Sequence, residues 1–368
     1  MTRRRRILTA ILTTAISTPA GAAVPTILKQ SKTDYTAAAT EVMRQIERGF
    51  SLDKSGLYAH SLADRKPDFM WGHGVMFSAL VGAVRHDPKT YTPRMMRYFR
   101  ALDRYWDAKA PIPGYEPAPT SGNGNDKYYD DNAWMVITFA EAYSLTRDEA
   151  FLKRARQAMT FVLSGEDNTL GGGIWWHERH KDDSKNTCAN APTVVGLLNL
   201  ASLTPAREKE WVDHARRLTE WTTNRLQLPS GLYADKVTAA TGVVEKTTWT
   251  YNTGLMIRAY LGLYRQDRSA DTLKKAITIA GAADALLDPK SGAYHDGLKF
   301  THLMAEADIE LYRVTGDERW LGRAVTTADV AYATWKTQPS KELIDAASLA
   351  RLLWLLSDLQ TGSGAATR

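Results

Sequence analysis

The stretch YYDDNAWMVITFAEAY, residues 128–143, places two neighbouring aspartates at the start of an apolar run with helical spacing. Five other runs are similarly rich in small and apolar residues: FMWGHGVMFSALVGAV (69–84), NTCANAPTVVGLLNLA (186–201), TTWTYNTGLMIRAYLGLY (247–264), LKFTHLMAEADIELYR (298–313) and ELIDAASLARLLWLLSDL (342–359). Runs of this length that lack a broad polar face predict helices buried on most sides.

Amphipathic segments lie between these six runs, and Asp or Thr in the polar turns suits a helix N-cap. They cover residues 35–50, 91–107, 146–163, 204–221, 270–287 and 315–332. Six apolar helices alternating with six amphipathic ones predict an all-α fold, an (α/α)6 barrel with an inner and an outer ring. An open helical solenoid is the alternative. No terminal capping unit stands out in the sequence, which favours the closed barrel.

A glycine followed by an aromatic residue recurs before several inner helices. The four units are SGLYAH (55–60), GGGIWWHE (171–178), SGLYADK (230–236) and SGAYHDG (291–297). Glycine permits tight turns, so these units predict short β-hairpins. Long loops and hairpins precede the inner helices, whereas the turns from inner to outer helices are short. The irregular sequence therefore gathers on one rim, where binding and catalytic residues are expected.

The first 22 residues, MTRRRRILTAILTTAISTPAGA, have four arginines, an apolar run and then small residues. This layout predicts an export signal peptide, with a loose fit to a twin-arginine signal. We expect a secreted, periplasmic or cell-surface protein with no stable membrane insertion, because the apolar run is too short to span a bilayer. Residues 23–33 are expected to be a linker, 34–360 a single catalytic domain and 361–368 a disordered tail.

Charge and cysteine content exclude some classes of protein. The formal net charge is +6, and removing the four arginines of the signal leaves 43 basic against 41 acidic residues, or +2. A nearly neutral mature chain argues against a nucleic-acid-binding protein. Cys188 is the only cysteine, so no intramolecular disulfide can form. We expect a monomer whose partner is a polysaccharide or oligosaccharide.

The two aspartates, Asp130 and Asp131, fall on this rim at the start of the second inner helix. One interpretation is structural: an N-cap and a first-turn acid, both favoured by the helix dipole. The other is catalytic. Because the helix is mostly buried, both carboxylates should point into the barrel mouth, where two such neighbours cannot both ionise easily. A neutral acid beside a carboxylate, about 5–6 Å apart, suits a retaining glycosidase.

Aromatic and polar residues on the same rim are candidates for binding sugar rings and hydroxyls. The aromatic candidates are Trp71, Trp175, Trp176, Trp249, Tyr251 and Tyr129. The polar candidates are Asn132, Asn190, Asp235 and Asn252, which could equally be caps or turn residues. His73 could be a core histidine or a functional one. Together these side chains favour a carbohydrate cleft.

Three segments, YYDDNAWMVITFAEAY, GGGIWWHERHKDDSKNTCANAP and TWTYNTGLMIRAYLGLYR, together resemble glycoside hydrolase family 76, the α-1,6-mannanases and related wall-mannan enzymes of fungi. The resemblance spans residues 35–359. It implies an (α/α)6 barrel and retaining hydrolysis of α-1,6-mannosidic bonds in mannan, with no metal and no cofactor. It also implies that Asp130 is the nucleophile and Asp131 the general acid/base.

The resemblance places five further residues at family-like positions in the cleft: Trp176, Asn190, Asp235, Tyr251 and Asn252. Two departures put the subsite preference in doubt. Thr253 stands where the family commonly has glutamine, and residues 187–189 differ from what the family leads us to expect. We expect endo action on mannan.

Other functions remain open at this stage. A mannan transglycosylase and an α-1,6-glucan-active hydrolase would use the same residues, whereas a non-catalytic glycan-binding protein would not need both carboxylates. A metal-dependent terpene cyclase would want Asp-Asp-x-x-Asp, but position 134 is Trp134. Sugar 2-epimerases need paired histidines and uronide hydrolases an arginine cluster, and neither is evident.

Overall fold

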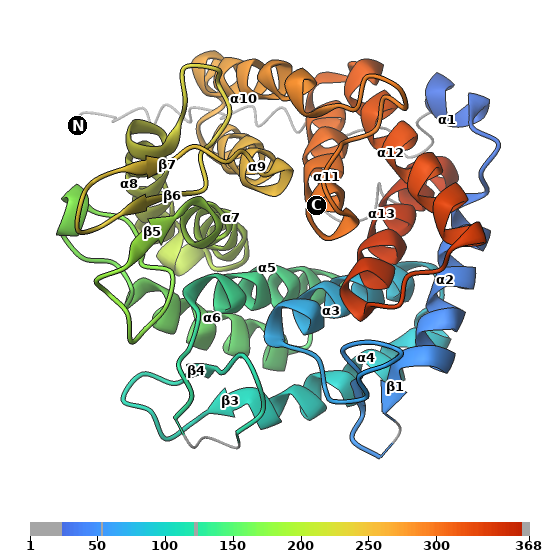
Figure 1. The fold of residues 1–368 in the computed structure, drawn as a ribbon, viewed down its shortest axis with the longest axis horizontal. Coiled ribbons are helices and arrows are strands. Elements are labelled where there is room, and N and C mark those ends of the chain that lie inside the picture. The colour runs from blue at the N-terminus through green and yellow to red at the C-terminus, as the bar shows by residue number, and fades with distance from the viewer. Residues whose placement is uncertain (1–23, 53, 121–123, 363–368) are drawn as a thin grey trace, which may run out of the picture.

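The computed structural model describes residues 24–52, 54–120 and 124–362. A ring of inner helices is surrounded by a ring of outer helices (Figure 1). The inner helices are α3 (Met70–His86), α5 (Tyr129–Thr146), α7 (Thr187–Leu203), α9 (Thr250–Asp267), α11 (Leu298–Thr315) and α13 (Leu343–Thr361). The outer helices are α2 (Tyr35–Phe50), α4 (Pro88–Ala101), α6 (Glu149–Leu163), α8 (Glu208–Leu226), α10 (Ala270–Ala282) and α12 (Glu318–Thr337).

Contacts between helices close the inner ring. Each inner helix packs against the next one along the chain, and α13 packs against α3, the first of them. Helix α13 also packs against the outer helix α2, so the C-terminal part of the chain closes the barrel against the N-terminal part. The (α/α)6 barrel is confirmed, and the open solenoid is excluded.

Helix N-termini differ between the two rings. Five outer helices begin with a side-chain cap, from Asp34, Asp87, Asp148, Ser269 and Asp317. Within the described part of the chain, no inner helix has such a cap. The dipoles of the six inner helices therefore meet at one rim without a capping side chain, and they favour negative charge there.

Short strands precede several inner helices and form part of the rim. The two-stranded pairs are β1 (Ser51–Leu52) with β2 (Leu57–Tyr58) and β3 (Trp106–Asp107) with β4 (Gly114–Tyr115). An antiparallel sheet has the order β5 (Ser184–Asn186), β6 (Lys236–Thr238), β7 (Val244–Glu245). Single 3-10 turns cover η1 (Leu102–Tyr105), η2 (Thr169–Gly171), η3 (Pro205–Arg207) and η4 (Ala283–Leu286).

The four glycine–aromatic units are less regular than predicted. SGLYAH forms a two-stranded hairpin, and Gly56 at its turn has φ 73°, a left-handed value that suits glycine. In the described residues, GGGIWWHE makes two isolated bridges, Glu166↔Ile174 and Tyr128↔His177, and SGAYHDG makes one, Leu287↔Tyr294. SGLYADK makes the bridge Gln227↔Tyr233 and then enters β6 at Lys236. The predicted tight turns are present, but most of these units are too short to form a ladder.

The N-terminal segment is more structured than the predicted linker. Helix α1 (Thr26–Gln30) packs against α12, and the backbone N–H groups of Thr26 and Ile27 donate to the Glu318 carboxylate at 2.9 and 3.0 Å. The predicted signal peptide and nearly all of the predicted tail lie outside the described residues. Among the described helices, none is long and apolar enough to cross a membrane.

Candidate active site

The paired aspartates Asp130 and Asp131 lie in the first turn of α5, whose N-cap is Tyr128. The predicted N-cap alternative is wrong, because Asp130 and Asp131 lie inside the helix and no side chain caps it. The backbone N–H of Tyr129 instead donates to the carbonyl of Trp176 at 3.0 Å. A neighbouring loop therefore binds the helix end, which leaves both carboxyl groups available for other contacts.

Asp130 accepts three hydrogen bonds. The N–H of Asp131 donates to Oδ1 at 2.9 Å, the indole N–H of Trp176 to Oδ2 at 3.0 Å, and the thiol of Cys188 to Oδ2 at 3.4 Å. Burial raises the pKa of Asp130, and these donors oppose the shift because they stabilise the ionised form. Tyr251 completes the network through its contact with the Cys188 thiol.

Asp131 has a different environment. Burial raises the pKa of Asp131 well above its usual value, and the negative charges of Asp130 and Asp68 raise it further. No donor is found that would stabilise an ionised Asp131 side chain among the described residues. When this pair holds one proton, the proton therefore resides on Asp131 and the charge on Asp130.

Asp68 is a third carboxylate beside this pair, and the sequence analysis missed it. Its Oδ1 accepts from the N–H of Phe69 at 2.8 Å and lies 2.6 Å from Nδ1 of His60. Its Oδ2 is buried without a hydrogen-bond partner among the described residues. Burial raises the pKa of Asp68 to about 6. A Cβ on Gly72 would lie 1.9 Å from Oδ2, so any side chain at this position in α3 would displace the Asp68 carboxyl group.

Four aromatic rings gather on the rim across α3, α9 and α11. The ring of Phe300 lies 5.6 Å from Trp71, 5.2 Å from Trp249 and 4.9 Å from Tyr251, measured between ring centroids. All four rings are partly exposed. Phe300 was not among the predicted site residues, although it holds Trp71, Trp249 and Tyr251 together. Partly exposed aromatic rings of this kind can stack on sugar faces.

Tyr129 and Trp175 do not line the mouth, contrary to prediction. The Tyr129 ring is fully buried and stacks on Phe161 of the outer helix α6, at 4.9 Å. Trp175 is 1% exposed, and its indole N–H donates to Asp167 at 2.8 Å. Both side chains pack the wall of the barrel, whereas the next residue, Trp176, reaches Asp130.

Asn132 and Asn190 are also structural, which corrects their prediction as sugar contacts. The amide of Asn132 accepts from Tyr115 N–H at 2.7 Å and donates to Tyr115 O at 3.0 Å. Asn190 makes the same pair of bonds to Ile174, again at 2.7 and 3.0 Å. Each buried amide therefore clamps a rim segment to an inner helix, and neither is free to bind a ligand.

Asn252 differs from these two asparagines. Its side chain is fully buried, and among the described residues its only polar contact is a loose one with the Asp235 carboxyl group. Asp235 lies beside it, and burial raises the pKa of that carboxyl. Buried amides whose hydrogen-bonding capacity is so little used are rare, so Asn252 and Asp235 remain candidates for contacts with sugar hydroxyls. His73, by contrast, is a core histidine whose Nε2 lies 2.7 Å from the Tyr105 hydroxyl.

Two adjacent, unequally protonated carboxyl groups on the rim of an (α/α)6 barrel can perform acid/base and nucleophilic chemistry on a glycosidic bond. With aromatic rings beside them, they define the class of carboxylate-dependent glycoside hydrolases.

Comparisons with known proteins specify this class further. The sequence profile of glycosyl hydrolase family 76 matches residues 32–296. The fold superposes with a TM-score of 0.84 on a family 76 α-mannanase from Bacteroides thetaiotaomicron, which is 24% identical, over 90% of this chain and 97% of that one. An α-1,6-mannanase from Salegentibacter sp. HEL1_6, 20% identical, gives a TM-score of 0.76 over 89% of this chain and 100% of that one.

A Schizosaccharomyces pombe protein, "Meiotically up-regulated gene 191 protein", is 28% identical over 202 residues. The match covers 52% of this chain and 45% of the yeast protein, less than half of its length. This chain belongs to glycosyl hydrolase family 76.

Proposed function

We propose that this chain is a retaining glycoside hydrolase that cleaves α-1,6-mannosidic linkages inside mannan chains. The observation that carries the proposal is the pair of neighbouring carboxyl groups with unequal surroundings: among the described residues, the Asp130 side chain has three donors and the Asp131 side chain has none. The Salegentibacter enzyme supports the substrate class. Inactive variants of it, with two adjacent aspartates replaced, were solved with α-1,6-mannotriose and α-1,6-mannotetrose.

The reaction proceeds in two steps. A carboxylate oxygen of Asp130 attacks the anomeric carbon, while Asp131 gives its proton to the departing glycosidic oxygen, so one C–O bond forms as the other breaks. Asp131, now ionised, then takes a proton from water, whose oxygen displaces Asp130 from the sugar. Configuration is retained because the carbon is inverted twice. The hydrogen bonds that Asp130 accepts suit a nucleophile, because its carboxylate is negatively charged before the glycosyl-enzyme forms and again after it breaks down.

The first test uses unbranched α-1,6-mannan with the wild type, Asp130→Asn and Asp131→Asn. We expect oligosaccharides from the wild type and a loss of at least about 10³-fold in either variant. Asp271→Asn, which changes an exposed first-turn aspartate of the outer helix α10, is the matched control. An even ladder of products indicates endo action, whereas release of one small product from the start indicates exo action.

The second test assigns the two roles with an aryl α-mannobioside and azide. Asp131→Ala should give the α-mannobiosyl azide, since azide replaces water in the second step, whereas Asp130→Ala should give the β-azide by direct displacement. The opposite stereochemistry would reverse the roles.

Products longer than the substrate would indicate a transglycosylase. Activity on α-1,6-glucan alone would replace mannan as the substrate, and binding of mannan without cleavage would indicate a glycan-binding protein.

We also propose that the enzyme is exported, on the basis of the arginine-rich and apolar first 22 residues. N-terminal sequencing of protein recovered outside the cytoplasmic membrane should find a start close to residue 23. Protein that stays in the cytoplasm with Met1 or Thr2 at its N-terminus would contradict export.

A further inference from the structure

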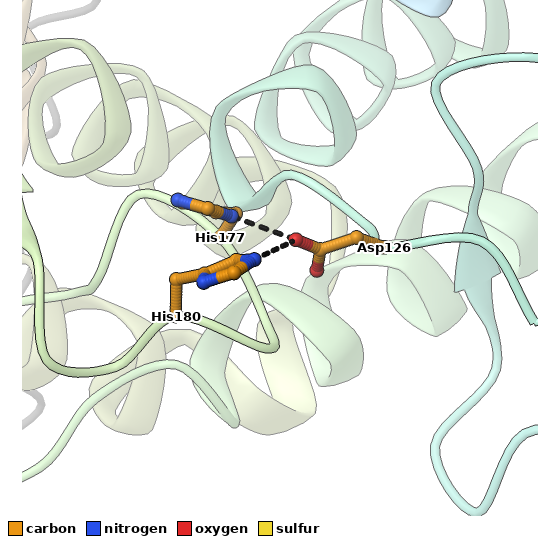
Figure 2. A group of neighbouring side chains, drawn as sticks. All are labelled: Asp126, His177 and His180. Atoms are coloured by element: carbon orange, nitrogen blue, oxygen red, sulfur yellow. Dashed lines mark hydrogen bonds and ion pairs between the residues drawn. The ribbon is translucent and has the colours of Figure 1, made fainter.

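Asp126, His177 and His180 form a cluster on the rim that the proposed reaction does not use. Oδ2 of Asp126 lies 2.8 Å from Nδ1 of His177 and 3.4 Å from Nε2 of His180 (Figure 2). One donor atom from each of the three residues lies within 4.8 Å of the others. The histidines are three residues apart in one loop, and Asp126 comes from the segment that leads into α5.

We propose that Asp126, His177 and His180 bind a divalent transition metal of the zinc type, in a structural site. Zinc takes two imidazole nitrogens and a carboxylate oxygen at about 2.0–2.2 Å in a tetrahedron, which separates neighbouring donor atoms by about 3.3–3.6 Å. The 3.4 Å between Asp126 Oδ2 and His180 Nε2 has that spacing. The 2.8 Å between Asp126 Oδ2 and His177 Nδ1 is a hydrogen-bond distance, which metal binding would widen by about 0.5 Å. Two imidazole ligands do not suit magnesium or calcium, which prefer oxygen.

The surroundings hold the donor groups in place. The second oxygen of Asp126, Oδ1, accepts from the backbone N–H of Arg179 at 3.0 Å. The guanidinium of Arg179 donates to the carbonyl of Gly124 instead, and no lysine or arginine of the described residues forms an ion pair with Asp126. The ring of His177 stacks on Tyr128 at 5.1 Å with a 12° angle. Such outer contacts orient metal ligands in proteins.

The cluster is open on one side. The side chains of Asp126 and His177 are 21% and 11% exposed, whereas that of His180 is 59% exposed. A metal can therefore enter from solvent and keep a water molecule as its fourth ligand. His180 can also be replaced without disturbing the packing of the barrel.

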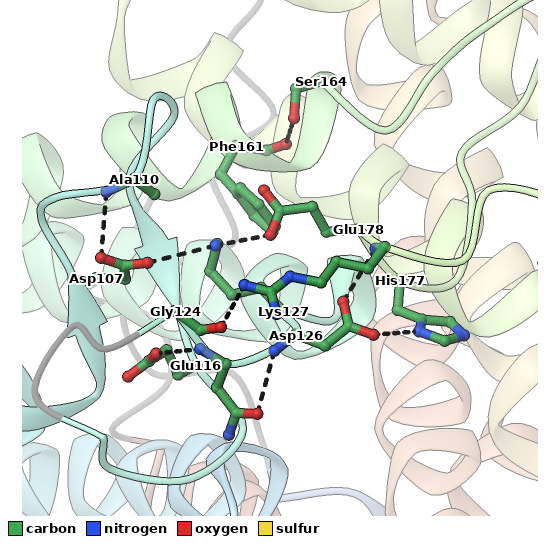
Figure 3. Close-up of polar contacts among 12 residues, drawn as sticks. Asp107, Ala110, Glu116, Gly124, Asp126, Lys127, Phe161, Ser164, His177 and Glu178 are labelled. Atoms are coloured by element: carbon green, nitrogen blue, oxygen red, sulfur yellow. Dashed lines mark hydrogen bonds and ion pairs between the residues drawn. The ribbon is translucent and has the colours of Figure 1, made fainter.

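The metal would tie together two segments that support the catalytic pair. Glu178 N–H donates to Lys127 O at 2.9 Å, and Lys127 Nζ lies 2.7 Å from Glu178 and 3.6 Å from Asp107 (Figure 3). The segment that contains Asp126 and Lys127 continues into α5. The segment that contains His177, Glu178 and His180 begins at Trp176, which contacts Asp130. Binding should therefore stabilise the rim, while the two-carboxylate chemistry itself needs no metal.

The test titrates Zn²⁺ into untagged, chelator-treated protein by calorimetry. We expect one Zn²⁺ per chain and a melting temperature about 3–4 °C higher at a hundredfold excess over Kd. His180→Ala and Asp126→Asn should each weaken binding at least about tenfold. The matched control is His295→Ala, because His295 is 45% exposed and 3.5 Å from the Asp296 carboxylate.

Three results would overturn the site: no stoichiometric Zn²⁺ in the wild type, full binding in His180→Ala or Asp126→Asn, or loss of binding in His295→Ala. Circular dichroism of each variant checks that it is folded. Because the titration contains no mannan, its result is independent of whether the proposed hydrolysis is correct.

Discussion

Asp130 and Asp131 have the same side chain, but their neighbours favour the ionised form of Asp130 and the protonated form of Asp131. Trp176 and Cys188 direct hydrogens at Asp130, which favours its charged form. Asp131 instead faces the charge of Asp68 as well as that of Asp130, which favours its protonated form. The difference comes from Asp68 in the loop before α3, from Cys188 on α7 and from Trp176 in the loop before β5, not from the aspartates themselves.

The thiol of Cys188 should influence the acid limb of the activity profile. It donates to Asp130, so Cys188→Ala removes a hydrogen bond that favours the ionised nucleophile. The pKa of Asp130 should rise, and the acid limb of kcat/KM should move to higher pH. Cys188→Ser keeps a donor of similar size and should leave the limb near its original position. Equal profiles for the alanine and serine variants would show that the contact does not tune Asp130.

The charge of Asp68 should influence the alkaline limb. Asp68→Asn removes a negative charge that opposes ionisation of Asp131, so the pKa of Asp131 should fall. Since the general acid must be protonated, the alkaline limb of kcat/KM should move to lower pH. Asp64→Asn, in the same loop, is the control and should not move it. A loss of kcat without any change in pH profile would point to a structural role for Asp68.

Only part of the site could be predicted from the sequence. Adjacent carboxylates before an apolar run are visible in the sequence itself, whereas the environment of Asp68 depends on His60 and on the space left by Gly72. Phe300 looks like one more apolar residue of an inner helix. Tyr129 was wrongly placed in the cleft because residues next to each other on a helix point in different directions.

The first turns of the inner helices α5, α7 and α9 place side chains of the same two kinds at the same positions. Two and three residues after the N-cap, side chains face the mouth: Asp130 and Asp131 in α5, Cys188 in α7, Tyr251 and Asn252 in α9. Four residues after it, a polar side chain holds the preceding rim segment: Asn132, Asn190 and Thr253, the last accepting from Tyr233 N–H at 3.3 Å. This spacing was readable in the sequence and would have separated clamps from site residues.

The three consecutive glycines before Ile174 form a turn around the ammonium group of Lys185. Its buried ammonium donates to the carbonyls of Gly172 and Gly173 at 2.7 and 2.8 Å and to Asp167 Oδ1 at 2.7 Å. Gly173 has φ 79°, and a Cβ there would lie 2.6 Å from the Trp221 ring. The turn thus wraps a cation, and it leads directly to Trp176.

Lys185→Met should destabilise this turn strongly. The apolar side chain would leave buried carbonyls unpaired, so we expect a loss of about 3 kcal/mol in the free energy of unfolding. Urea unfolding measures it, with Lys181→Met, a change at an exposed lysine in the same loop, as the control at less than about 1 kcal/mol. Similar stability of the two variants would contradict a structural role for the buried ammonium.

The helices were more predictable than their ends. Alternation of apolar and amphipathic runs indicated both rings, because an inner helix is buried on most of its sides whereas an outer helix is buried on one side only. The outer segments 91–107 and 270–287 were drawn too long, because α4 and α10 end at Ala101 and Ala282 and tighten into 3-10 turns. Helix α1 was missed because a single turn with one buried residue, Leu28, has no periodicity to detect.

The barrel as a whole separates two kinds of buried charge. At the rim, no lysine or arginine of the described residues forms an ion pair with Asp130, Asp131 or Asp68, and burial together with the charges of Asp130 and Asp68 raises the pKa of Asp131. About two helical turns deeper, Arg351 of α13 lies 2.8 Å from Glu306 of α11 and 3.0 Å from Glu141 of α5. Arg258 of α9 lies 3.2 Å from Glu306 as well. The Arg351–Glu141 pair joins inner helices that are far apart in the chain, whereas the other two pairs join successive inner helices.

The last prediction concerns this deep network. Arg351→Met would leave Glu306 and Glu141 short of a buried partner, so we expect a loss of about 3–5 kcal/mol in the free energy of unfolding at pH 7. Arg265→Met, which removes a 45%-exposed arginine paired with Glu310, is the control and should cost less than about 1 kcal/mol.

The effect of Arg351 should also depend on pH. Burial alone would raise the pKa of Glu306, but Arg258 and Arg351 outweigh it and lower that pKa to about 2. A carboxyl whose pKa is lowered by folding stabilises the protein above its usual pKa of about 4.3 and loses that contribution as pH falls toward 2. The stability gap between wild type and Arg351→Met should therefore be largest near pH 7 and shrink between pH 4 and pH 2. Urea unfolding across that range measures the gap, and a constant gap would mean that Arg351 acts through packing and not through its charge.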